Sequence, residues 1–128
     1  MAGLIDGEGS ILLDRSHKNQ SRYPSVSMTS TSPELIEFCQ TTFGGTVVLH
    51  KKYKEHYKQS WVWTIRSNAC LTFLEKLLPF MKEKKKIRRA SLLITEYKSV
   101  TAANGKYSEE MLKAKKDFET RFFEEEST

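Results

Sequence analysis

The chain has 128 residues, enough for one domain and too few for two of ordinary size. It carries no run of about 18 apolar residues and no signal-peptide pattern, which argues against a membrane span or a secreted precursor. Lys and Arg number 21 against 16 Asp and Glu, and the acids gather near the C-terminus, so the remainder is basic enough to bind a polyanion. We expect one soluble, intracellular domain over residues 1–128.

The first part of the chain predicts a helix, a β-hairpin and a second helix. Apolar residues at i, i+3 and i+4 favour a short helix over residues 1–8. Residues 10–30 hold two alternating segments on either side of a polar stretch, which favours a hairpin. The Ser-Pro-Glu sequence at 32–34 is a helix start, with an N-cap serine and a proline at the first helical position. The Gly-Gly pair at 44–45 ends that helix.

A second hairpin follows over residues 46–67, with a charged turn at 54–58. Its alternating strand carries Trp61 and Trp63 on one side. These rings are either core residues or stacking platforms for single-stranded nucleic acid, and their spacing favours the core.

Three helices complete the chain. Asn68 is expected to cap the first of them, which Pro79 interrupts. The lysine-rich segment 82–89, interpreted mainly as a solvated helix face, leads into the second helix over residues 90–100, whose apolar positions include Ile87. An Asn-Gly turn then precedes the final helix, which Ser108 caps.

The element order α-β-β-α-β-β-α-α-α predicts an α+β fold, with four antiparallel strands forming a saddle. Cys39 and Cys70 lie in apolar helical patterns without CxxC spacing, so buried free thiols are favoured over a disulfide or a metal site. The three histidines, at positions 17, 50 and 56, match no zinc-site spacing.

The first ten residues carry the chemistry. Gly3 and Gly7 are four apart and lie on one helix face with Ala2, so the backbone there is bare enough for another helix to approach closely. If that helix comes from a second subunit, two copies of Glu8 emerge together. Two neighbouring carboxylates repel unless divalent cations lie between them, and oxygen-only ligands favour Mg²⁺.

MAGLIDGEG resembles the LAGLIDADG motif of homing endonucleases, and the element order matches the αββαββα core of that family, here with additional C-terminal helices. FLEKLLPFMKEKKKIRRA is similar to the segment after the family's fourth strand. Six of the nine motif positions are identical: Ala2, Gly3, Leu4, Ile5, Asp6 and Gly9. The resemblance implies a homodimer that makes double-strand breaks at a long pseudo-palindromic DNA site and supports intron or intein mobility. The implied dimer interface comprises Ala2, Gly3, Asp6 and Gly7.

The resemblance also implies a set of site residues. Glu8 and the Gly9 carbonyl would hold Mg²⁺, with Mn²⁺ or Ca²⁺ as alternatives. Lys84 takes the position of a lysine near the scissile phosphate, and Thr29, or Ser30 beside it, stands where the family often has Gln or Asn. The family's first helix normally begins before the motif, so a truncated start or a shorter interface helix, and with it a weaker dimer, is expected.

Strand alternation predicts the surface that contacts DNA, since two-stranded ribbons fit the major groove. If Ile11 and Leu13 face the helices, their neighbours face DNA. The predicted contacts are Leu12, Asp14, Ser16, Lys18, Gln20, Arg22, Ser25, Ser27, His50, Lys52, Lys58 and Arg66.

Other functions remain open at this point. An RNA-binding intron maturase would keep the fold and assist splicing. A cleavage-deficient, sequence-specific DNA-binding protein would keep the surface without the chemistry. A structural protein with an incidental basic surface is a more distant alternative, which salt-insensitive or absent DNA binding would support.

Overall fold

The structure is a computed structural model that describes residues 1–15, 22–50, 59–101 and 107–124, without the side chains of Asp6 and His50. No helix among these residues is long and apolar enough to cross a membrane. The elements are α1 (Ala2–Glu8), β1 (Gly9–Asp14), β2 (Tyr23–Ser30), α2 (Pro33–Phe43), β3 (Thr46–His50), β4 (Ser60–Arg66), α3 (Ser67–Leu77), the 3-10 helix η1 (Leu78–Phe80), α4 (Lys84–Glu96), the 3-10 helix η2 (Lys98–Val100) and α5 (Glu109–Phe123).

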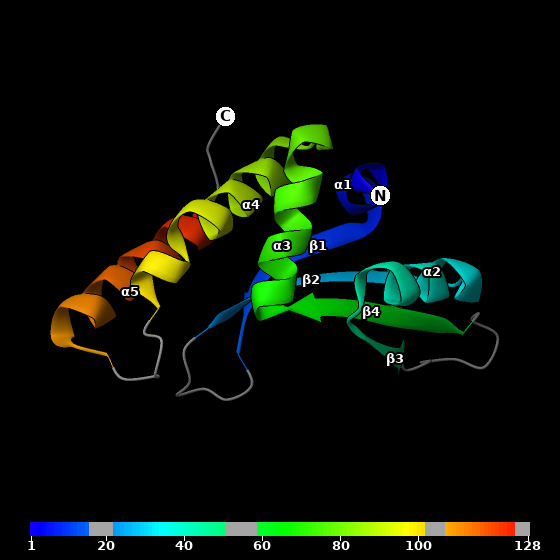
Figure 1. Ribbon diagram of the computed structural model, residues 1–128, viewed down its shortest axis with the longest axis horizontal. Helices are drawn as coiled ribbons and strands as arrows, with labels where there is room; N and C mark the ends of the chain where they lie inside the picture. Colours follow the sequence, from blue (N-terminus) through cyan, green and yellow to red (C-terminus); the bar gives the residue numbers. More distant parts are fainter. Residues whose placement is uncertain (16–21, 51–58, 102–106, 125–128) are drawn as a thin grey trace.

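The four strands form one antiparallel sheet in the order β1-β2-β4-β3. The helices gather on one side of this sheet, and its other side, called the open face below, carries no helix among the described residues (Figure 1). The predicted α+β architecture with a four-stranded antiparallel sheet is therefore confirmed.

Register decides which residues build the core. On the helix side, ladder partners such as Ile11 and Val26, or Met28 and Trp63, are almost fully buried. Trp63 has 0% exposure, and its Nε1 donates to the Gly44 carbonyl at 2.8 Å. The interpretation of this tryptophan as a core residue is confirmed. Trp61, on the same side, is half-buried against the core.

Most helix boundaries follow their local signals. The Ser32 hydroxyl accepts from the Leu35 N–H at 3.3 Å, and Ser108 caps α5 in the same way. The expectation for Asn68 was wrong. Arg66, which makes no side-chain cap bond, is the N-cap of α3, because β4 runs directly into the helix through Ser67 at φ +57°. Helix α4 begins at Lys84, so most of the 82–89 segment is helical.

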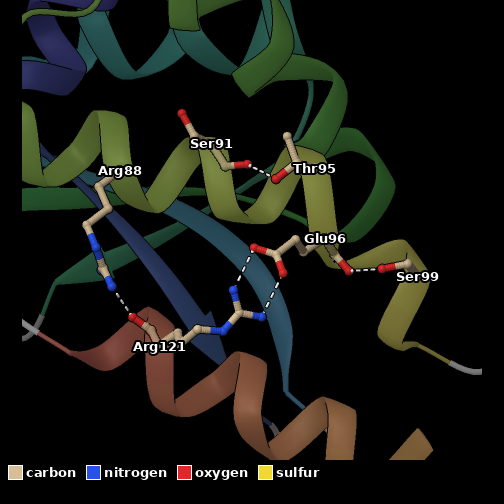
Figure 2. Close-up of polar contacts among 6 residues, drawn as sticks. All are labelled: Arg88, Ser91, Thr95, Glu96, Ser99 and Arg121. Carbon is tan, nitrogen blue, oxygen red and sulfur yellow. Dashed lines mark hydrogen bonds and ion pairs between the residues drawn. The ribbon is translucent and has the colours of Figure 1, made fainter.

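Helices α4 and α5 lie side by side and are joined by polar contacts (Figure 2). The Arg121 guanidinium donates a hydrogen bond to each carboxylate oxygen of Glu96, at 2.9 and 2.6 Å. These bonds lower the pKa of that carboxyl. The Arg88 guanidinium donates to the main-chain carbonyls of Arg121 and Phe122 at the end of α5. These two carbonyls would otherwise lack intrahelical partners, so Arg88 caps α5.

The two cysteines are free and buried, as the sequence predicted. Burial raises the pKa of the Cys70 thiol to about 12 and also raises that of Cys39. Both thiols are therefore protonated and unreactive at neutral pH.

Lys115 of α5 is a buried cation. Its side chain is 3% exposed, its Nζ donates to the Thr101 hydroxyl at 2.7 Å, and it lies 4.1 Å from the centre of the Tyr97 ring. Burial lowers the pKa of its ammonium to about 8, against an attraction to Glu119 that acts the other way. This side chain joins α5 to Tyr97 and Thr101 at the end of α4 and beyond it.

Lys115 predicts a pH dependence of stability. Between pH 8 and about 10 the unfolded chain keeps this proton while the folded protein loses it, so the Lys115 contribution to the unfolding free energy rises with pH. We expect Lys115→Met to lack this rise. The buried thiols act in the opposite sense above pH 9. Urea unfolding of the wild-type and Lys115→Met proteins from pH 7 to 10 measures the difference between their unfolding free energies. If that difference does not change with pH, the lowered pKa of Lys115 is contradicted.

The α2–β3 connection is a close approach of two chain segments. Gly44 and Gly45 have φ values of +81° and +93°, which L side chains rarely adopt. A Cβ on Gly45 would lie 2.5 Å from the Thr64 carbonyl oxygen, whereas one on Gly44 would meet nothing within 4 Å. Only the second glycine is therefore required for packing as well as for backbone conformation.

This difference gives a matched pair of variants. Both Gly44→Ala and Gly45→Ala incur a backbone strain of about 1–3 kcal/mol. Gly45→Ala also forces the chain away from Thr64, and we expect it to reduce the unfolding free energy by about 1–3 kcal/mol more than Gly44→Ala does. Chemical denaturation measures both. If both variants lose the same unfolding free energy, the close approach of Gly45 to Thr64 does not affect stability.

Candidate metal site and nucleic-acid interface

Glu8 is the last residue of α1 and its side chain is exposed. It lines a hollow of about 580 Å³. The remaining lining residues are Leu4, Met28, Thr29, Ser30, Thr31, Leu35 and Ser60. The structure thus brings together Glu8 and Thr29, which the sequence assigned to one site from opposite ends of a hairpin.

The turn from α1 into β1 has no loop residues, because the helix ends at Glu8 and the strand begins at Gly9. The Gly9 N–H donates to the Ile5 carbonyl and closes the last helical turn. A Cβ on Gly9 would lie 3.0 Å from both Cα and Cδ1 of Ile5. Glycine is therefore the residue that lets the strand leave the helix at this point.

The donors around Glu8 fit a hard divalent cation. They are a carboxylate and hydroxyl groups, with no side-chain nitrogen among the lining residues, and the only sulfur there is the thioether of the buried Met28. In the part of the chain that the structure describes, no group of three or more His, Cys, Asp or Glu side chains gathers. Among the described side chains, this hollow thus offers one carboxylate, that of Glu8, which suits Mg²⁺ because this ion keeps several waters and shares itself with substrate phosphates.

Lys84 lies in a different hollow from Glu8. It is the exposed first residue of α4 and lines a groove of about 850 Å³ between β1 and the start of that helix. The groove also includes Gly9, the residue that follows Glu8. The lining residues are Gly9, Ser10, Ile11, Leu12, Glu83, Lys84, Lys85, Lys86, Arg88, Arg89 and Glu124.

One face of α1 is bare. Gly3 and Gly7 are exposed, and a Cβ on either would meet nothing within 4 Å. The prediction that Ala2 shares this face is wrong, because Ala2 stands three residues before Ile5 and is buried with it in the hydrophobic core. The Asp6 side chain lies outside the described part.

The open face of the sheet is rich in hydroxyl groups. The ladder aligns Leu12 with Ser25 and Arg66, and the next row holds Ser10, Ser27, Thr64 and Thr46. Leu12, Asp14, Ser27 and Arg66 thus lie on this face as predicted, whereas Ser25 is only 1% exposed there. Sequence reasoning missed three hydroxyl residues that strand alternation alone would have found, namely Ser10, Thr46 and Thr64.

Several predicted contacts lie outside the described residues: Ser16, Lys18, Gln20, Lys52 and Lys58. His50 ends β3 opposite Ser60, and its side chain is not described.

Comparison with known proteins assigns the family. The profile of the LAGLIDADG-like domain matches residues 1–78, more than half of the chain. The chain belongs to the LAGLIDADG family. No curated protein sequence matches it.

Solved structures show the same LAGLIDADG fold. The homing endonuclease I-TnaI aligns with a TM-score of 0.62 at 16% identity, over 96% of this chain and 85% of that one. The archaeal intron-encoded homing endonuclease I-Vdi141I, complexed with DNA, gives 0.55 at 19% identity, over 98% and 83%. The homing endonuclease I-CvuI, in complex with the I-CreI target in the presence of 2 mM Mg with the DNA not cleaved, gives 0.53 at 18% identity, over 99% and 82%.

Arg22, predicted to contact DNA, has partners within this LAGLIDADG protein that the sequence did not predict. Its Nη1 donates to the Leu13 carbonyl at 3.1 Å, and its guanidinium lies 4.9 Å from the centre of the Phe123 ring. Its Nε also lies 3.8 Å from a Glu119 carboxylate oxygen. Three partners from β1 and α5 thus compete with any DNA phosphate for this side chain.

Three cations of the 82–89 segment also bind protein rather than only solvent. Lys86 Nζ donates to the Ile5 carbonyl at 2.8 Å, and Arg89 Nη1 donates to the Ile11 carbonyl at 2.9 Å. Arg88 caps α5 as described above. No local pattern marks these roles, because each partner lies more than 30 residues away in the sequence.

Proposed function

We propose that this LAGLIDADG protein is a site-specific endonuclease that makes metal-dependent double-strand breaks in a long pseudo-palindromic DNA site as a homodimer. The observation that carries the proposal is the end of α1, where the exposed carboxylate of Glu8 follows a bare helix face formed by Gly3 and Gly7. The family assignment and the DNA complexes of I-Vdi141I and I-CvuI support DNA as the substrate.

The bare face explains why a second subunit is needed. Two α1 helices that pack through Gly3 and Gly7 approach closely, as small-residue helix pairs do. The two Glu8 carboxylates then emerge beside each other. Their mutual repulsion is relieved when divalent cations bind between them. Among the described side chains, the hollow of one subunit offers a single carboxylate, so the complete site requires the pair.

The open face provides the DNA surface in this proposal. Its rows of Ser and Thr hydroxyls donate and accept hydrogen bonds, which suits base edges and phosphates alike. Arg66, exposed at the end of β4, adds a cation that suits guanine or a phosphate. A sheet twisted into a saddle follows the major groove on each side of the dimer axis.

The chain's own residues have distinct roles at the cut. When bound, Mg²⁺ supplies Lewis-acid activation of water and of the phosphate, and Mn²⁺ or Ca²⁺ are alternative occupants. Glu8 and the Gly9 carbonyl hold the ion in place. The Thr29 hydroxyl, in the same hollow as Glu8, orients the water. Lys84 stabilises negative charge on the phosphate from the groove that also includes Gly9.

Glu8→Gln tests the catalytic assignment. The amide has the same shape but no charge, and the side chain is exposed, so the fold is unaffected. We expect cleavage of a duplex library in Mg²⁺ to fall by roughly 100-fold or more, while duplex affinity in Ca²⁺ stays within about threefold. Gel assays of cleavage and retention measure both.

Mixed dimers sharpen this test. A dimer with one wild-type and one Glu8→Gln subunit is expected to nick one strand, because each subunit supplies one carboxylate. Equal loss of binding and cleavage in Glu8→Gln would contradict the metal role. Selective duplex binding by the wild-type protein without any metal-dependent cut would favour a DNA-binding regulator.

Gly7→Leu tests the dimer. A side chain at this position meets open space within the subunit, so the unfolding free energy is unchanged or higher, but the second α1 helix is held away. We expect the solution mass to fall to that of a monomer and double-strand cleavage to disappear. Light scattering measures the mass. Lys113→Leu on α5, also exposed, is the control and is expected to leave both unchanged; a dimeric Gly7→Leu protein would contradict the interface.

A further inference from the structure

The last turn of α1 is held by a residue from the other end of the fold. Lys86 Nζ donates to the main-chain carbonyl of Ile5 at 2.8 Å across 81 residues of sequence. The same carbonyl accepts the Gly9 N–H that closes the helix. The carbonyl oxygen of Ile5, three residues before Glu8, thus joins the turn into β1 to the first turn of α4.

The two helix ends that meet here both depart from the usual charge preferences. Glu8 ends α1, where the helix macrodipole disfavours an acid, and no basic residue stands in that turn. α4 begins with three lysines, at positions 84–86, and has no acid in its first turn. The Lys86 ammonium lies against the negative end of α1, so each departure offsets the other. Such local departures concentrate at functional sites.

The start of α4 is a firm anchor. The Glu83 carboxylate accepts the Lys86 N–H at 2.7 Å and caps the helix. Arg89, one turn further on, bonds the Ile11 carbonyl of β1 and lies 4.9 Å from the centre of the Phe122 ring of α5. The Lys86 side chain therefore extends from a helix that is fixed to both the sheet and α5.

We propose that Lys86 is a positioning residue for the metal site at Glu8. It acts through Ile5, fixing the direction of the last turn of α1 and therefore the orientation of the Glu8 carboxylate and the Gly9 carbonyl. The same helix carries Lys84, so the bond also sets the relative position of the two halves of the site. This inference rests on the proposed function and adds to it a residue outside the motif.

A simple charge effect makes the opposite prediction. If Lys86 only placed a positive charge near the ion, its removal would strengthen metal binding. If it positions the ligands, its removal weakens metal binding, because the last turn of α1 loses a fixed direction. A rise in the Mg²⁺ concentration needed for cleavage therefore indicates positioning, and a fall indicates a charge effect.

The experiment uses the full-length Lys86→Met variant. Methionine replaces the aliphatic stem of the lysine with an apolar chain of similar length and removes the ammonium group that donates to the Ile5 carbonyl. In the metal-free protein, exchange of the Gly9 amide hydrogen, followed by NMR, is expected to accelerate about tenfold, because this N–H shares its acceptor with Lys86. The Mg²⁺ concentration for half-maximal cleavage is expected to rise at least about tenfold. Duplex affinity in Ca²⁺ is expected to stay within about threefold.

Two further variants serve as controls. Arg89→Met removes a comparable bond from the same helix to a main-chain carbonyl, that of Ile11. It is expected to lower stability by a similar amount, yet to leave Gly9 exchange and the Mg²⁺ midpoint unchanged. Lys86→Arg keeps a long cationic donor and is expected to restore both quantities to within about threefold of wild type.

Unchanged Gly9 exchange in Lys86→Met overturns the proposal, and so does a lower Mg²⁺ midpoint. Equal effects of Lys86→Met and Arg89→Met on both readouts also overturn it, since they show a loss of general stability. If the wild-type protein neither cuts DNA nor responds to Mg²⁺, the proposed function itself fails. Gly9 exchange still decides in that case whether Lys86 holds the end of α1.

Discussion

The contact between Gly9 and Ile5 is the constraint on which the rest of the site depends. The helix passes into the strand without a loop, and a Cβ on Gly9 would crowd Ile5 at 3.0 Å. The direction in which Glu8 leaves α1 is therefore coupled to the register of β1. That register places Gly9 opposite Met28 on the helix side and Ser10 opposite Ser27 on the open face. A slip by one residue would expose Ile11 and Leu13 and turn Ser10 and Asp14 toward the core.

Helices α4 and α5 support strand β1 from the edge of the sheet. β1 is an edge strand, so one row of its carbonyls lacks a ladder partner. Arg89 and Arg22 donate to two of these carbonyls, those of Ile11 and Leu13. α5 in turn holds both arginines through the rings of Phe122 and Phe123. The C-terminal helix is thereby part of the support for the first strand, and its packing reaches the residues next to the site.

The sequence predicts what local chemistry determines. N-caps at Ser32 and Ser108, the end of α2 at Gly44 and the burial of Trp63 all follow from neighbouring residues or from strand alternation. Asn68 failed because Ser67 adopts a left-handed conformation and lets β4 enter α3 directly, so the expected N-cap lies inside the helix. Ala2 failed because a spacing of three places it with Ile5 on the core side. The partners of Arg22, Lys86 and Arg89 depend on tertiary structure. The sequence of a lysine-rich helix start does not show whether its side chains are solvated or donate to the carbonyl of a distant helix.

Stability and assembly are carried by different parts of this subunit. Among the described residues, every buried side-chain nitrogen or oxygen has a hydrogen-bond partner, and one continuous apolar core extends from Ile5 to Phe122. The bare face of α1, by contrast, makes no contact that the fold needs. In the proposed dimer, the energy of association therefore comes from surface that folding leaves unused. In that dimer, changes at Gly3 or Gly7 affect assembly and leave the fold intact, whereas a side chain at Gly9 disturbs the fold because Gly9 packs on Ile5.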